Sequence, residues 1–181
     1  MDKEIIAENF SNPHIILVTG GQRSGKSEFA EKFAFGLSRC PVYVATAVVA
    51  DEEMQKRVDL HKKRREHGWK NLEAPLVFSS LEVEKQDVVL LDCLTLLATN
   101  WFFEEKENVG NALTKIKDQL DILFSKVHTV IVVTNEIGLG GISPNKLQRK
   151  FTDLQGWINQ YVASLAEEVY LMVSGIPVKI K

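Results

Sequence analysis

A run of eight residues near the start of the chain constrains its fold more than any other feature. The run has the pattern G-x-x-x-x-G-K-[ST] and consists of Gly20, Gly21, Gln22, Arg23, Ser24, Gly25, Lys26 and Ser27. Its glycines let consecutive backbone N–H groups turn inward to bind phosphate oxygens, and a helix that follows adds its positive N-terminus. In such a loop Lys26 reaches the β- and γ-phosphates of a nucleoside triphosphate, and the Ser27 hydroxyl binds Mg²⁺.

The surroundings of this run favour phosphate binding over the alternative, a glycine-rich turn without a ligand. Four short apolar runs predict strands that are buried on both faces, and they cover residues 15–19, 42–46, 87–92 and 130–134. The first run ends at Gly20, and Phe29 and Phe33 follow the loop at helical spacing. A further helix is predicted within residues 111–126. Strands alternating with helices predict an α/β fold, here a single-domain P-loop NTPase (RecA-like) with a mostly parallel sheet and helices on both faces.

The C-terminal part of the chain predicts one amphipathic helix and an antiparallel edge hairpin. Apolar residues recur at intervals of three or four, namely Leu147, Phe151, Leu154, Ile158, Tyr161 and Leu165. Pro144 suits the first turn of that helix. Residues 169–173 and 178–180 flank Ser174-Gly175-Ile176-Pro177, which predicts a tight turn between two strands. We therefore expect one catalytic domain over residues 14–181, with residues 1–13 as an N-terminal extension.

Composition narrows the class of protein. The chain has 181 residues, 45% of them apolar and 25% charged, and its net charge is −2. This balance gives no electrostatic footprint for a nucleic-acid partner. Cys40 and Cys93 are too few and too isolated for a disulfide framework or a zinc site. Residues 1–13 lack a secretory apolar region, and no apolar run is long enough to span a membrane. We expect a cytoplasmic enzyme.

Two carboxylates follow predicted strands and are candidate active-site acids. Asp92 ends the run 88–92, where a P-loop enzyme usually places the carboxylate for its Mg²⁺. The alternative is that Asp92 caps the helix that begins near Cys93. Glu136 follows the run 130–134 and is expected at the same edge of the sheet, as a second, catalytic acid. The alternative for Glu136 is a loop residue that bonds only to its neighbours.

His61 has an unusual setting for a histidine. It shares a predicted helical face with Met54, Val58 and Arg65. The basic run Lys62, Lys63, Arg64 and Arg65 follows it directly. Nearby positive charge favours the neutral imidazole, which is a competent nucleophile toward phosphorus, and the basic run suits the attacked phosphates. On spacing alone, a solvated helical histidine remains the alternative. His14, His67 and His128 lack such a setting and are expected to be structural or exposed.

From residue 15 to residue 181 the chain resembles the bifunctional adenosylcobinamide kinase / adenosylcobinamide-phosphate guanylyltransferase family. The resemblance depends on several runs in order: residues 18–27, 43–46, 51–54 with Arg57 and His61, Trp69 with Glu73, 90–95 through 99–100, 133–138 and 173–181. A generic P-loop match would not reproduce these runs.

The resemblance implies two reactions in one domain. The first transfers the γ-phosphoryl group of ATP or GTP to adenosylcobinamide. The second transfers GMP from GTP to the resulting phosphate through a GMP–histidine intermediate, whose position in this chain is His61. The family's nucleotide contacts correspond to residues 20–27, to Thr46, Ala47 and Val48, to residues 62–65, and to Glu73 and Asp92. The resemblance also implies a corrinoid substrate and a homotrimer.

Three departures from the family pattern affect the expected site. Asp92 stands where glutamate is frequent, Glu66 where proline is frequent, and the loop 138–142 is one residue longer. Two other functions stay open: a small-molecule kinase in which His61 takes no part, and a nucleotide-hydrolysing switch. A guanine-specific switch is disfavoured because Asn145-Lys146-Leu147 is followed by Gln148 rather than aspartate.

Overall fold

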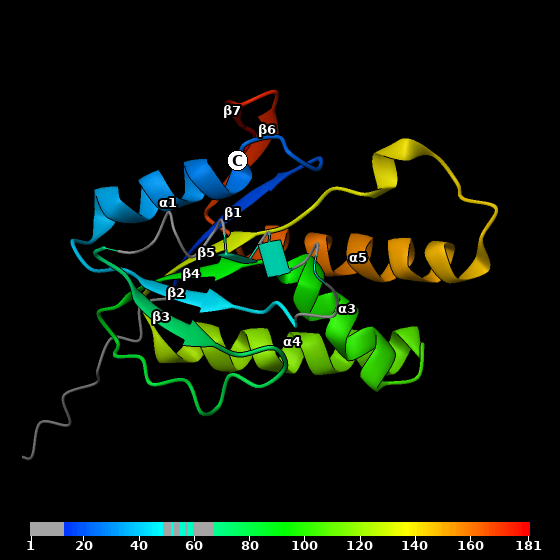
Figure 1. Cartoon of the computed structure of the whole chain (residues 1–181), viewed down its shortest axis with the longest axis horizontal. Coiled ribbons are helices and arrows are strands. Elements are labelled where there is room, and N and C mark those ends of the chain that lie inside the picture. Colours follow the sequence, from blue (N-terminus) through cyan, green and yellow to red (C-terminus); the bar gives the residue numbers. More distant parts are fainter. Residues whose placement is uncertain (1–12, 49–51, 53–54, 57, 60–66) are drawn as a thin grey trace, which may run out of the picture.

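The computed structural model describes residues 13–48, 52, 55–56, 58–59 and 67–181. These residues form a seven-stranded sheet with the strand order β3-β2-β4-β5-β1-β6-β7 (Figure 1). The strands are β1 (His14–Gly20), β2 (Val42–Ala45), β3 (Lys70–Glu73), β4 (Val88–Asp92), β5 (Thr129–Val133), β6 (Glu168–Val173) and β7 (Ile176–Lys179). All neighbouring strands are parallel except β6 and β7, which are antiparallel. The predicted mostly parallel sheet with a C-terminal edge hairpin is confirmed.

Helices cover both faces of this sheet. Helix α1 (Lys26–Leu37) lies on one face, and α3 (Leu94–Glu104), α4 (Val109–Lys126) and α5 (Lys146–Leu165) lie on the other (Figure 1). A 3-10 turn, η1 (Gly138–Gly140), lies in the long loop before α5. The layered α/β arrangement predicted from the sequence is therefore present.

Alternating side chains of β1 contribute to two separate parts of the core. Leu17 packs in the cluster that contains the apolar faces of α3, α4 and α5. Val18 packs in the cluster with Ala30 and Ala34 of α1, which are both fully buried. Since alanine has the smallest side chain that still favours a helix, α1 can approach the sheet closely. The loop of residues 21–25 connects the end of β1 to the start of α1, as in a P-loop.

Two details of the C-terminal region differ from the prediction. Pro144 is not in the first turn of α5, because Asn145 is the N-cap residue and its side chain accepts hydrogen bonds from the backbone N–H groups of Leu147 (2.8 Å) and Gln148 (3.3 Å). The hairpin turn is shorter than predicted: it contains only Ser174 and Gly175, while Ile176 and Pro177 already belong to β7. Pro177 is tolerated there because β7 is an edge strand.

Strand β3 was not predicted from the sequence. Its sequence, Lys-Asn-Leu-Glu, has one apolar residue, and three of its four residues are exposed. It forms an edge of the sheet by parallel pairing with β2. Among the described helices, none is long and apolar enough to cross a membrane.

Candidate active site

The predicted site residues that the structure describes converge on one edge of the sheet, where the parallel strands end. In the sheet register, Asp92 of β4 lies beside Ala45 of β2 and Val133 of β5. The backbone N–H of Glu136 donates to the carbonyl oxygen of Gly20, at 3.0 Å, so the chain after β5 is fastened to the start of the P-loop. Ligands of open α/β sheets bind at such an edge.

The P-loop, residues 20–27, has the backbone conformation that its glycines predicted. Gly20 has φ 149° and Gly25 has φ 93°, values that residues other than glycine rarely adopt. The Lys26 ammonium folds back over the loop and donates to the carbonyl oxygen of Gly21, at 2.5 Å. Ser27 lies in the first turn of α1 and is half-buried.

Lys26 is a buried cation, with 8% of its surface exposed. Burial lowers the pKa of its ammonium, and the negative charge of Asp92 acts in the opposite direction. Lys26 and Asp92 are therefore electrostatic neighbours, although Lys26 begins the helix that follows β1, and β5 separates β1 from the strand of Asp92. A triphosphate bound to the loop would favour the charged ammonium, because opposite charge stabilises it.

Asp92 is oriented by a tyrosine that sequence reasoning did not select. The Tyr43 hydroxyl donates to Asp92 Oδ2 at 2.8 Å, and Tyr43 is itself almost fully buried. Trp69 packs edge-on against the Tyr43 ring, with 5.7 Å between ring centroids. The alternative role of Asp92 as the N-cap residue is not supported, since Cys93 occupies the N-cap position of α3. The sequence signal for this role was the hydroxyl group of one tyrosine, Tyr43, within an otherwise apolar predicted strand.

The chain that leaves β2 is held in place by Thr46. Its hydroxyl donates to the carbonyl oxygen of Cys93 (2.8 Å) and accepts from the Cys93 N–H (3.0 Å). The side chain of Asn100 donates to the carbonyl oxygens of Thr46 and Pro75, both at 2.8 Å. Burial, and secondly the charge of Asp92, raises the pKa of the Cys93 thiol to about 12. The thiol therefore stays protonated and is not a candidate nucleophile.

Glu136 is half-buried and receives a hydrogen bond from α5. Asn159 Nδ2 donates to Glu136 Oε2 at 3.4 Å and to the carbonyl oxygen of Asn135 at 3.1 Å. Asn159 Oδ1 accepts from the Thr134 hydroxyl and from Gln155 Nε2, both at 2.8 Å. Buried polar side chains are costly unless they are bonded, so this set fixes the end of β5. Gln155 and Asn159 on an otherwise apolar helix face were the signal that sequence reasoning missed.

The remaining candidates are exposed or half-buried residues near this edge and residues outside the described ranges. Glu73 is exposed at the end of β3, beside Ala45 in the register. Ala47 is half-buried and Val48 is exposed, both on the chain after β2. His61 and the basic run of residues 62–65 lie outside the described residues. As expected, His67 and His128 are exposed, and His14 makes contacts at the other end of β1.

This edge combines a loop of the P-loop pattern, a buried cation, an oriented carboxylate and a second acid, an arrangement suited to phosphoryl transfer. A family model described as cobinamide kinase / cobinamide phosphate guanyltransferase matches residues 16–180. The chain is 38% identical to the bifunctional adenosylcobalamin biosynthesis protein CobU of Salmonella typhimurium, over 92% of this chain and 99% of that protein.

Two further relatives agree. The corresponding CobU protein of Escherichia coli is 37% identical, over 92% of this chain and 99% of its own length. The bifunctional adenosylcobalamin biosynthesis protein CobP of Pseudomonas aeruginosa is 35% identical, over 91% of this chain and 96% of its own. With the family model spanning nearly all of the sheet and its loops, the chain belongs to the cobinamide kinase / cobinamide phosphate guanyltransferase family.

Proposed function

We propose that this enzyme transfers a phosphoryl group from ATP or GTP to adenosylcobinamide, and then transfers GMP from GTP to the adenosylcobinamide phosphate so formed. The observation that carries the proposal is the convergence of the P-loop, Asp92 and Glu136 on one edge of the sheet, in a chain of this family. Pyrophosphate and adenosylcobinamide-GDP are the final products.

In the first step, the acceptor hydroxyl oxygen attacks the γ-phosphorus, and the bond from that phosphorus to the β–γ bridging oxygen breaks. The P-loop N–H groups and Lys26 hold the phosphates in line and offset the negative charge on the oxygens. Because Lys26 is buried, water screens its charge only weakly. Glu136, held by Asn159, is the proposed acceptor of the hydroxyl proton.

Ser27 and Asp92 fit the role of Mg²⁺ ligands. Hydroxyl and carboxylate oxygens are the ligands that Mg²⁺ prefers, and nucleotide phosphates usually supply the others. The described residues contain no group of three or more His, Cys, Asp or Glu side chains placed to hold a metal ion, so a site formed with the nucleotide suits this chain better than an all-protein cage. Bound there, Mg²⁺ would neutralise charge on the β- and γ-oxygens.

In the second step, His61 is the proposed nucleophile. Its imidazole nitrogen attacks the α-phosphorus of GTP and pyrophosphate leaves. A phosphate oxygen of adenosylcobinamide phosphate then attacks the same phosphorus, and the bond to the imidazole breaks. Division of the transfer into two displacements is the general advantage of a covalent intermediate. Residues 62–65 are the proposed partners of the phosphates in this step.

The location is inferred from the composition, including the two isolated cysteines, and the assembly is inferred from the family resemblance. We place the enzyme in the cytoplasm and expect a homotrimer. Sedimentation of the purified protein at the mass of a single 20.4 kDa chain would contradict the trimer.

The test of the proposed function is product analysis with a P-loop variant. Wild type, incubated with adenosylcobinamide, GTP and Mg²⁺, is expected to form adenosylcobinamide phosphate and then adenosylcobinamide-GDP, detected by mass spectrometry. Lys26→Ala is expected to lower the phosphoryl-transfer rate at least ~10²-fold with the fold intact. Lys32→Ala, on the exposed side of the same helix, is the matched control and should keep the wild-type rate. Near-normal turnover in Lys26→Ala, or absence of both products with wild type, would contradict the proposal.

A further inference from the structure

The turn of the C-terminal hairpin lies against the P-loop. The backbone N–H of Gly175 donates to the carbonyl oxygen of Ser24, at 3.0 Å. A Cβ atom on Gly25 would come within 3.2 Å of Gly175 Cα, tighter than nearly all real contacts. A Cβ on Gly20 would lie 2.7 Å from the carbonyl oxygen of Met172 in β6. The hairpin therefore leaves no room for a side chain at Gly20 and little room for one at Gly25.

The turn itself holds a conformation that depends on its residues. Ser174 has φ 51° and Gly175 has φ 84°, so both central residues are left-handed, as in the turns that best fit two-residue hairpins. A Cβ on Gly175 would meet no atom within 4 Å. Glycine at this position is therefore favoured by backbone conformation and not by lack of space.

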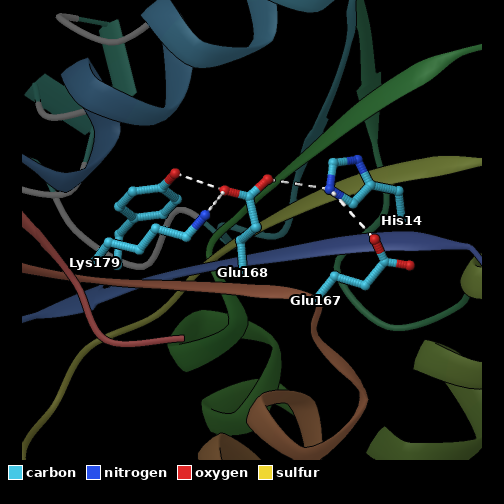
Figure 2. Close-up of polar contacts among 5 residues, drawn as sticks. His14, Glu167, Glu168 and Lys179 are labelled. Atoms are coloured by element: carbon cyan, nitrogen blue, oxygen red, sulfur yellow. Dashed lines mark hydrogen bonds and ion pairs between the residues drawn. The ribbon is translucent and has the colours of Figure 1, made fainter.

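The other end of the hairpin is fixed by a polar cluster around Glu168 (Figure 2). Glu168 Oε2 accepts from Lys179 Nζ at 2.7 Å and from the Tyr170 hydroxyl at 2.6 Å. Glu168 Oε1 contacts His14 Nε2 at 3.2 Å, which joins the hairpin to the first residue of β1. Lys179 pairs with Tyr170 in the β6–β7 register, several residues from the turn. The hairpin thus contacts the first residue of β1 through Glu168, and it contacts the P-loop through its turn.

We propose that the Ser174–Gly175 turn is a positioning element for the P-loop, which holds the Ser24–Gly25 backbone in the conformation that binds phosphate. Among contacts to this half of the loop, the Gly175 hydrogen bond comes from outside the β1–α1 unit and reaches the backbone directly. Lys26 follows this backbone at once, so a shift of the turn moves the cation and the loop N–H groups together. The inference rests on the nucleotide binding proposed above.

Three variants separate this role from general stability. Gly175→Val places a β-branched side chain at a left-handed residue, where it is strongly disfavoured. Gly175→Asn keeps a residue that tolerates this conformation. Gly141→Val is the matched control, since Gly141 has φ 88° and open space around its Cβ, in a loop after η1. The probe is α,β-methylene GTP, a nucleotide whose α–β bridge cannot be cleaved, in the presence of Mg²⁺. The measured quantities are the Kd of the probe, by calorimetry, and the Tm of each variant.

We expect Gly175→Val to weaken binding about tenfold, Gly175→Asn to bind like wild type, and Gly141→Val to lose Tm without losing affinity. Wild-type affinity in Gly175→Val, or equal losses of affinity in Gly175→Val and Gly141→Val, would overturn the inference while leaving the nucleotide site in place. No binding of the probe by wild type would overturn the proposed function itself, and this inference with it.

Discussion

At the scale of single residues, the site depends on how its charges are oriented. Asp92 accepts a hydrogen bond from Tyr43, and its charge acts on Lys26, whose pKa is lowered by burial. A carboxylate that is fixed by a buried phenol keeps one orientation, which reduces the entropy lost when it binds a metal ion. Tyr43 is therefore a positioning residue for the proposed Mg²⁺ ligand.

Tyr43→Phe tests this role because it removes only the hydroxyl and keeps the ring against Trp69. We expect the Mg²⁺ concentration for half-maximal kinase activity to rise about 10-fold. Asp92→Asn, which removes the ligand charge, should have a larger effect. Activity measured over a Mg²⁺ titration checks both. An unchanged half-saturation in Tyr43→Phe, with a folded protein, would show that the phenol has no influence on the metal.

At the scale of elements, the β6–β7 hairpin at one edge of the sheet is expected to be sensitive to acid. The hydrogen bonds from Lys179, and secondly from Tyr170, lower the pKa of Glu168 from its ordinary value of 4.5 to about 2. A carboxylate whose pKa is lower in the folded state than in the unfolded state stabilises the fold, and this contribution is complete at a pH where the group is ionised in both states. That contribution is present above pH 4.5 and is lost as the pH falls toward 2.

Glu168→Gln is therefore expected to lower Tm at neutral pH and to flatten the fall of Tm between pH 4.5 and 2. Glu167→Gln is the matched control, because Glu167 is adjacent and more exposed, and its carboxylate lies 3.7 Å from His14 Nε2. Thermal melts over this pH range make the comparison. If Tm falls equally steeply between pH 4.5 and 2 in wild type and Glu168→Gln, Glu168 is not the group whose titration causes the fall.

The elements that the sequence predicted best are those whose burial dictates their composition. β1, β4 and β5 are buried on both faces, so their residues are apolar without interruption. β3 has no such requirement because it is a short exposed edge, and its pairing with β2 is set by the tertiary structure. The first turn of α5 was misplaced because a cap by Asn145 outweighs the preference of proline for that turn.

At the scale of the whole molecule, the site is assembled from segments that are distant in sequence. The glycine and lysine pattern was sufficient to predict the P-loop, and strand ends predicted the shared edge with Asp92 and Glu136. Contacts across the fold could not be predicted in this way. The hydrogen bonds of Tyr43 to Asp92, Asn159 to Glu136 and Gly175 to Ser24 depend on which strands and helices become neighbours.

The proposed enzyme carries out two transfers in one domain. The phosphoryl transfer needs the donor, the acceptor and the loop in line, and none of these needs an imidazole nucleophile. The guanylyl transfer, as proposed, uses His61 as the nucleophile, and this residue lies outside the described residues. Substitution of His61 should therefore separate the two activities, whereas a kinase alone or a nucleotide switch would form no covalent nucleotide.

The most direct measurement is incubation with α-labelled GTP and Mg²⁺ followed by denaturing electrophoresis. Wild type should carry a label that survives base, is lost in acid and is discharged by adenosylcobinamide phosphate. His61→Ala and His61→Asn should carry no label and form no adenosylcobinamide-GDP, while their kinase activity falls only through lost nucleotide contacts. His67→Asn, at an exposed histidine, is the control and should label normally. A label retained in His61→Ala, or the absence of any label in wild type, would contradict the account.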